Sequence, residues 1–194
     1  MDSFLLCLVL VTGIAMGGRD QWLVAQLSDA FAKGPGDPRR PLPVLVLASA
    51  SAALTAAAMA YAGASLAALL PQRAAEMLIA FALAIAAFEL AWPVRVKPIR
   101  EPTRNGVAVV IVLVWRQFGD AARFIVFAFA AEALYPLTAF LGGALGGSVA
   151  VALGWWLGAV GLTRFPLRGW RLALAALTIV AAIFIGLNAR YAIY

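Results

Sequence analysis

The residues in this sequence best suited to chemistry are an aspartate and two arginines that interrupt a long apolar run. The run covers residues 107–131, and its interruption at 115–123 reads Trp-Arg-Gln-Phe-Gly-Asp-Ala-Ala-Arg. A run of this length can cross a hydrocarbon layer of about 30 Å as one helix. Because ions are costly to desolvate at that depth, Arg116, Asp120 and Arg123 are expected to face a protein interior or a wet cavity. We call residues 115–123 the central polar segment.

A second polar interruption, residues 17–21 with the sequence Gly-Gly-Arg-Asp-Gln, divides the apolar run that opens the chain. We call it the N-terminal polar segment. Each of the two segments falls in the first predicted helix of its half of the chain. Their carboxylates, guanidinium groups and carboxamides could bind an ion between them, so the two segments predict one shared site.

The charges of the two segments could instead neutralise one another. Arg116 precedes Asp120 by four residues and Arg123 follows it by three, so both can reach Asp120 on one helix face. Arg19 and Asp20 are helix neighbours that point about 100° apart, so they cannot share one partner. Internal ion pairing is therefore the alternative to an ion-binding site. Cross-pairs of Arg19 with Asp120 and of Asp20 with Arg123 would satisfy all four groups.

The composition is that of an integral membrane protein. Of the 194 residues, 64% are hydrophobic and 12% are charged, and the mean hydropathy is +0.95. Several runs approach the roughly 18 apolar residues of a membrane-spanning helix. The net charge of +6 comes mainly from loops between these runs, so it indicates membrane topology and no nucleic-acid partner.

The chain has one cysteine and no histidine. One cysteine excludes an internal disulfide and a thiolate metal cluster, and the absence of histidine removes the commonest transition-metal ligand. A bound metal would need oxygen ligands, which suit Mg²⁺, Ca²⁺ or Mn²⁺. The sequence contains no nucleotide-binding loop, catalytic triad or metal-ligand spacing, so it predicts no enzyme and no cofactor.

Proline and turn signals divide the sequence into six predicted membrane spans. The first is expected to bend near Gly17 and Gly18. A basic, proline-rich linker, residues 93–105, joins two groups of three spans, residues 1–92 and 106–194. The spans are expected at about residues 3–31, 41–70, 74–92, 106–134, 136–162 and 171–189.

The basic residues predict how the spans cross the membrane. Only Arg73 and Arg190 flank one side, whereas ten of the fifteen Lys and Arg residues flank the other. The positive-inside rule places the ten-residue side in the cytoplasm. The prediction is a multi-pass protein of the cell inner membrane with both termini outside the cytoplasm. The ten are Lys33, Arg39, Arg40, Arg95, Lys97, Arg100, Arg104, Arg164, Arg168 and Arg171.

The two halves share landmarks that predict an internal repeat. Pro41 and Pro71, which open the second and third spans, recur 95 positions later as Pro136 and Pro166. A copy made of three helices must insert upside down. The predicted fold class is therefore an all-α integral membrane protein with six transmembrane helices in a 3+3 inverted repeat, which in transporters places the site near the midplane.

Small residues predict where the helices pack closely. Glycines on the fifth span and alanines on the second recur at small-xxx-small spacing, which lets helix backbones approach each other. These stripes are expected to be packing surfaces without chemistry. They comprise Gly142, Gly143, Gly146, Gly147, Gly154 and Gly158, and Ala48, Ala52, Ala56 and Ala60.

The central polar segment resembles the signature of the GDT1 family (UPF0016/TMEM165). That signature reads Glu, hydrophobic, Gly, Asp, Lys or Arg, Thr or Ser, once in each half of a six-helix inverted repeat. Gln117 takes the Glu position, Gly119 and Asp120 match, and Ala121 and Ala122 replace the last two positions.

The N-terminal polar segment takes the place of the first copy of the motif. Only Gly18 stays in register, at an offset of 101 from Gly119. Met16 takes the Glu position, Arg19 takes the Asp position, and the aspartate is displaced to Asp20. The chain thus resembles a divergent member of the family with degenerate motifs.

The resemblance implies a secondary transporter that exchanges Mn²⁺ or Ca²⁺ for protons. Carried onto this sequence, it makes Asp20 and Asp120 the metal ligands and adds Gln117, Gly18 and Gly119 to the ion-binding set. The carboxylates would serve as both cation ligands and proton acceptors. The three arginines of the polar segments would form a charge network around them.

Two other functions stay open at this point. Three arginines beside two aspartates also fit a transporter of an anionic or zwitterionic solute. A non-transporting membrane scaffold with a decayed site is the third alternative. The expected partners are the lipid bilayer and a small inorganic ion, with a homo-oligomer as an open possibility.

Three glutamates outside the polar segments are expected at the ends of spans. Glu76 and Glu89 lie near the outer and cytoplasmic ends of the third span, where interfacial solvation is expected. Glu132 lies near the outer end of the fourth span, with a place in an external vestibule as its alternative.

Overall fold

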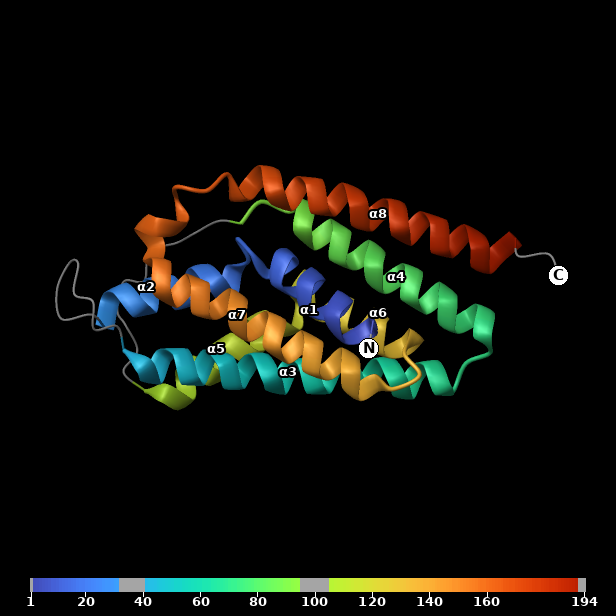
Figure 1. The fold of residues 1–194 in the computed structure, drawn as a ribbon, viewed down its shortest axis with the longest axis horizontal. Helices are drawn as coiled ribbons and strands as arrows, with labels where there is room; N and C mark the ends of the chain where they lie inside the picture. The colour runs from blue at the N-terminus through green and yellow to red at the C-terminus, as the bar shows by residue number, and fades with distance from the viewer. Residues whose placement is uncertain (1, 32–40, 95–104, 192–194) are drawn as a thin grey trace.

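The computed structural model describes residues 2–31, 41–94 and 105–191. These residues form eight α-helices and no β-strand (Figure 1). Residues 95–104 of the predicted linker and most of the predicted cytoplasmic basic residues lie outside the described residues. The helices are α1 (Asp2–Ala15), α2 (Arg19–Phe31), α3 (Leu42–Ala68), α4 (Gln72–Ala91), α5 (Gly106–Phe118), α6 (Ala121–Glu132), α7 (Pro136–Leu162) and α8 (Leu167–Tyr191).

The helix starts follow the proline and capping signals of the sequence. Pro41 and Pro71 directly precede α3 and α4, and Pro136 opens α7. Proline suits these places because the first helical turn has no intrahelical partner for its amide groups. The Asn105 side chain caps α5 by accepting a 3.0 Å hydrogen bond from Val107 N.

Four helices, α3, α4, α7 and α8, are long and apolar enough to cross a membrane. α1 and α2 make a fifth span if they are counted together. They meet at an angle of 65°, which confirms the predicted bend. The predicted fourth span, 106–134, is not one helix, because it divides into α5 and α6 at Gly119 and Asp120. The described helices thus provide four or five of the six predicted spans.

The two broken helices lie among the longer ones (Figure 1). α3 packs against α5 and α6, and α7 packs against α1 and α2. α3 and α7 also pack against each other, while α4 and α8 run side by side as a second pair. α6 contacts α1, α3, α4 and α7. This arrangement buries Asp20 and Gln21 of the N-terminal polar segment and Gln117 and residues 120–123 of the central polar segment, at the breaks.

Glycines bring α7 close to α1. A Cβ on Gly142 would lie 2.6 Å from Phe4 O, and one on Gly146 would lie 2.8 Å from Leu8 O. Both oxygens belong to the backbone of α1, so any larger side chain would push the helices apart. The stripe on α7 is therefore a packing surface, as its spacing predicted.

The outer surface of the helices is rich in large apolar side chains. Trp115 is 81% exposed, Phe184 75% and Val160 72%. A soluble protein rarely leaves so much apolar surface in contact with water. Helix faces of this kind suit contact with lipid, in agreement with the apolar composition.

Candidate functional site

Asp20 and Asp120 come together where the two broken helices meet. Both side chains are buried, with 4% and 6% exposure. A Cβ built on Gly18 would lie 2.8 Å from Asp20 Oδ1 and 3.5 Å from Asp120 Oδ1. The two carboxylates therefore face one small space beside Gly18, although they lie 100 positions apart in the chain.

The side chain of Gln21 forms hydrogen bonds with backbone groups at the break between α1 and α2. Its Oε1 accepts a 2.7 Å hydrogen bond from Gly17 N, and its Nε2 donates to Ala150 O of α7 at 2.9 Å. Gly17 has a φ of +73°, a left-handed conformation that glycine adopts readily. The buried carboxamide thus satisfies backbone groups that a break within a membrane would otherwise leave unpaired.

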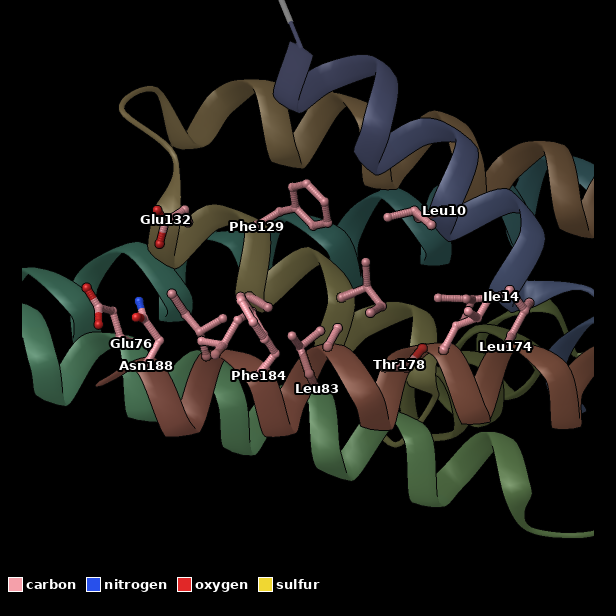
Figure 2. A pocket seen from close by; sticks show the side chains of 16 residues that line it. Leu10, Ile14, Glu76, Leu83, Phe129, Glu132, Leu174, Thr178, Phe184 and Asn188 are labelled. Carbon is pink, nitrogen blue, oxygen red and sulfur yellow. The ribbon is translucent and has the colours of Figure 1, made fainter. Parts of the chain in front are cut away.

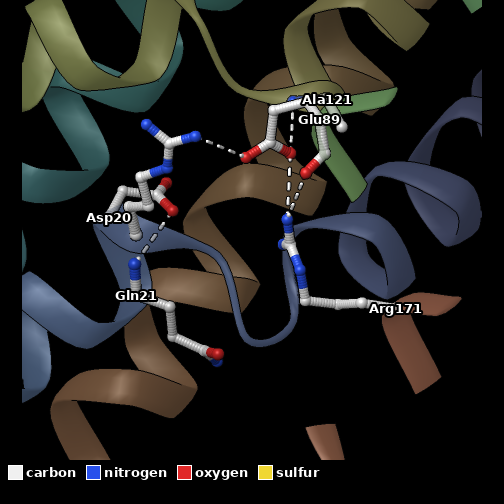
Figure 3. A network of polar contacts seen from close by, with 6 residues as sticks. Asp20, Gln21, Glu89, Ala121 and Arg171 are labelled. Carbon is white, nitrogen blue, oxygen red and sulfur yellow. Dashed lines mark hydrogen bonds and ion pairs between the residues drawn. The ribbon is translucent and has the colours of Figure 1, made fainter. Parts of the chain in front are cut away.

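Glu89 of α4 plays the corresponding part at the start of α6 (Figure 3). Ala121 N, the first amide of α6, donates to Glu89 Oε2 at 3.4 Å, where a carboxylate also interacts favourably with the helix dipole. Arg171 Nη2 of α8 donates to the same oxygen at 3.0 Å and to Glu89 O at 3.1 Å. Arg19 Nη2 lies 3.5 Å from Glu89 Oε1. One glutamate therefore connects α2, α4, α6 and α8.

The expectation that Glu89 is solvated at the membrane surface is wrong. Its exposure is 7%, and that of Arg171, which was grouped with the loop charges, is 2%. Each neutralises the other, and a buried ion is tolerated when it is paired and hydrogen-bonded. The sequence signal was a lone glutamate near the end of an apolar helix, which is equally typical of an interfacial residue.

Arg123 is the largest fully buried side chain among the described residues, with 1% exposure. Its Nη1 lies 3.5 Å from Gly143 O of α7. Its Nη2 would lie 2.8 Å from a Cβ on Gly147, so this glycine makes room for the guanidinium group.

The predicted cross-pairs between the two polar segments are not formed in the described part of the chain. Arg19 pairs with Glu89, and Arg123 has no carboxylate within 4.0 Å. The reason is that α4 supplies a third buried carboxylate, Glu89, which pairs with Arg19. The predicted cross-pairs considered only the charges of the two polar segments. Asp20 Oδ1 instead accepts a 2.9 Å hydrogen bond from Gln21 N at the start of α2.

Three residues of the central polar segment do not take part in the meeting of the carboxylates. They are Arg116, Gln117 and Gly119. Gln117 is fully buried, and its Oε1 accepts a 3.0 Å hydrogen bond from Thr55 Oγ1 of α3. Arg116 and Gly119 are exposed at the end of α5. The predicted contact of Arg116 with Asp120 is wrong because α5 ends before Asp120, and the i, i+4 spacing holds only within one helix.

The two helices that follow the breaks start one residue further apart in the chain than the two glycines of the motif alignment. α2 begins at Arg19 and α6 at Ala121, an offset of 102 rather than 101. In this register Gly18 corresponds to Asp120, and the buried Gln21 corresponds to the buried Arg123.

Several buried donors near the site have no hydrogen-bond partner among the described residues. They are Gln117 Nε2, Arg123 Nε, and Arg171 Nε and Nη1. Buried polar groups are normally paired, so these donors suit a species that accepts hydrogen bonds. No three acidic or cysteine side chains in the described part of the chain are grouped so that they could hold a metal ion. The arrangement offers two carboxylates to a cation or proton and guanidinium groups to an anion.

Comparison with known proteins leaves the chain without an assigned family. No protein-family model matches it, and no curated protein or solved structure shows significant similarity to it. The resemblance to the GDT1 family therefore stays a prediction, and it depends on the residues of the two polar segments.

Proposed function

We propose that the protein is a secondary transporter that exchanges a divalent cation, Mn²⁺ or Ca²⁺, for protons across a membrane. The observation that carries the proposal is the meeting of Asp20 and Asp120 beside Gly18. Ionisable side chains buried between membrane helices are expensive, and they commonly mark ion pathways. Broken helices that present their ends to a shared site are typical of transporters built from repeats.

The two carboxylates would bind the cation and the protons in turn. Their like charges repel when they are close together, so a proton or a cation between them relieves that repulsion. A divalent cation needs several oxygen ligands to replace its hydration shell. Backbone oxygens of the break could add to the set, since Ala15 O also lies 3.0 Å from the Cβ position of Gly18. Competition for the same oxygens would couple the two fluxes.

The proposal includes an inverted repeat of two three-helix units, 1–92 and 106–194, with α5 and α6 forming one broken span. In support, each half begins with a broken helix, continues with a helix of 27 residues, and ends with a second long helix. The 27-residue helix of each half packs against the broken helix of the other half. α7 contacts α1 and α2, and α3 contacts α5 and α6.

The proposed location is the cell inner membrane, with both termini outside the cytoplasm. Arg164, between α7 and α8, and Arg168, in the first turn of α8, are both exposed. The connection from α7 to α8 lies at the end of the molecule where α2 ends and where α3 and α5 begin (Figure 1). The positive-inside rule favours the cytoplasm for this end.

Unpaired arginine donors favour a second candidate, a transporter of an anionic or zwitterionic solute. Arg123 and Arg171 are almost fully buried, and together they offer three nitrogens without a partner among the described residues. Guanidinium groups bind carboxylates and phosphates strongly when water is excluded. In this case Asp20 and Asp120 would serve as proton acceptors or bind the positive end of a zwitterion.

Flux measurements in proteoliposomes test the proposal. Mn²⁺ and Ca²⁺ uptake is measured with the purified protein, with and without an imposed pH gradient. We expect gradient-driven uptake that falls at least tenfold in Asp120→Asn and Asp20→Asn. Asp29→Asn is the matched control, because its side-chain oxygen can still accept the 2.8 Å hydrogen bond from Ala159 N, away from the site.

Each outcome of the flux measurement favours one of the three functions. Gradient-driven metal uptake that depends on Asp20 and Asp120 supports metal and proton exchange. Proton-coupled uptake of an anionic or zwitterionic solute that is lost in Arg123→Met would favour the second candidate. A stable protein that moves neither class of solute would favour a non-transporting scaffold.

A further inference from the structure

A cavity of about 570 Å³ lies between α1, α4, α6 and α8 (Figure 2). Its size is within the range of about 300–1,000 Å³ that is usual for binding sites, and it is many times the roughly 30 Å³ of one water molecule. Most of its lining is apolar, and its polar side chains are Glu76, Glu132, Asn188 and Thr178.

One end of the cavity is acidic. Figure 2 shows Glu76, Glu132 and Asn188 together at this end. α6 ends at Glu132, α4 begins four residues before Glu76, and α8 ends three residues after Asn188. Glu132 is exposed and Glu76 is half-buried. Among the described residues that line the cavity there is no lysine or arginine, so the lining of this mouth carries two carboxylates at the ends of three helices. Arg73 of α4 and Arg190 of α8 lie at the same end of these helices but outside the lining.

The other end of the cavity approaches the buried charges. Figure 2 shows Ile14, Leu174 and Thr178 at this end. Residues three or four apart lie on the same face of a helix. Leu174 thus follows Arg171 by one turn on α8. A Cβ on Gly17 would lie 3.3 Å from Arg171 Cδ, so this part of α8 lies against the break between α1 and α2. The cavity therefore runs from the acidic mouth toward the space where Asp20 and Asp120 meet.

We infer that this cavity is the water-filled entry path by which a cation reaches Asp20 and Asp120 from the side where α6 ends. Glu76 and Glu132 raise the local concentration of cations at its mouth, because a cleft lined by charges of one sign focuses the field. Beyond its deep end, Glu89 and Arg171 join α4 to α8 near the opposite ends of these helices. The identity of the cargo rests on the proposed function, whereas the presence of water and the preference for cations do not.

Cysteine labelling tests the path without measuring transport. Cys7 is the one cysteine of the chain and is fully buried, so a Cys7→Ser background allows single cysteines to be placed. Thr178→Cys and Ala181→Cys introduce thiols at the cavity lining. Val180→Cys is the matched control on the same helix, because Val180 is 64% exposed and does not line the cavity.

The probes are water-soluble methanethiosulfonates with a trimethylammonium or a sulfonate group, applied to the protein in vesicles. Each rate is divided by the rate with a small free thiol. We expect both cavity positions to react at least tenfold faster than Val180→Cys, with a several-fold preference for the cationic reagent. Replacing both Glu76 and Glu132 by Gln should abolish that preference and keep the reactivity.

Two results would overturn the inference. In the first, both cavity positions react with the water-soluble reagents no faster than Val180→Cys does. If they then react only with a lipid-soluble maleimide, lipid fills the cavity. The other is a cation preference that survives the double Gln replacement, or no preference at all. If the labelling results are as expected but no metal flux is measured, the proposed cargo is rejected and the inferred water-filled path still stands.

Discussion

Glu89 Oε2 lies 3.0 Å from Arg171 Nη2, and both side chains are almost fully buried. The same oxygen accepts a 3.4 Å hydrogen bond from Ala121 N. One carboxylate therefore neutralises the charge of Arg171 on α8 and caps the start of α6. The second oxygen of Glu89 faces Arg19, whose side chain is 52% exposed. The inner ion pair is therefore the structural one, and the outer pair is open to solvent.

We expect Glu89→Gln to destabilise the protein strongly. The substitution leaves Arg171 buried without a counter-charge, and breaking a buried pair from one side costs about 3–5 kcal/mol. Arg19→Ala is the matched control, because a half-exposed pair contributes only about 0–1 kcal/mol. Thermal unfolding of the purified protein in detergent, followed by tryptophan fluorescence, measures both.

A double variant separates the charge effect from the loss of packing. Replacing Glu89 and Arg171 together by Met removes both charges and keeps apolar volume, so it should be less destabilising than Glu89→Gln. Equal midpoints for Glu89→Gln and Arg19→Ala would show that the inner pair has no structural role.

Gly18→Ala should reduce transport at least tenfold. The added Cβ would lie 2.8 Å from Asp20 Oδ1 and 3.0 Å from Ala15 O, so it would occupy the space that the two carboxylates face. Gly169→Ala is the control, because a Cβ there meets nothing within 4 Å. The measurement is the proteoliposome flux of both variants. Wild-type flux in Gly18→Ala would place the cation somewhere other than beside this glycine.

The sequence was sufficient to predict the helical class, most helix ends and the first break. Proline and glycine act through the local backbone, so Pro71, Asn105 and the Gly17-Gly18 pair place their boundaries without knowledge of the neighbours. The second break was missed. Residues 106–134 were interpreted as one helix with a polar interruption. The extended conformation of Asp120 (φ −87°, ψ 142°) lies beside Ala121, whose amide is bound by Glu89 of another helix, α4.

The site was predicted less completely, because its partners come from distant helices. The position of Asp20 and Asp120 inside apolar runs indicated that they face a protein interior, but it could not show that Glu89 of α4 would take the arginine of α8 as its partner. The distance along the chain between Glu89 and Arg171 is 82 positions, and neither residue has a local signal that points to the other. Arg116 was included because helical spacing was applied across a break.

We expect Gln21→Leu to destabilise the protein by about 1–3 kcal/mol. The change removes the acceptor of Gly17 N and the donor to Ala150 O, and a buried group left unpaired costs about that much. Gln26→Leu on the same helix is the control, because Gln26 is only half-buried. The thermal midpoints of the two variants in detergent give the comparison, and a Gln21→Leu midpoint equal to that of Gln26→Leu would contradict this role.

Gly17→Ala should destabilise the break between α1 and α2. Gly17 has a φ of +73°, where an L residue costs roughly 1–2 kcal/mol. Its Cβ would also lie 3.0 Å from Leu167 Cβ and 3.3 Å from Arg171 Cδ, which would disturb the arginine that holds Glu89. Gly13→Ala is the matched control, because its Cβ would make ordinary contact with Trp170 at 3.6 Å. We therefore expect a clearly lower unfolding midpoint for Gly17→Ala and a nearly unchanged one for Gly13→Ala. Equal midpoints would mean that the chain can pass the break without a left-handed residue.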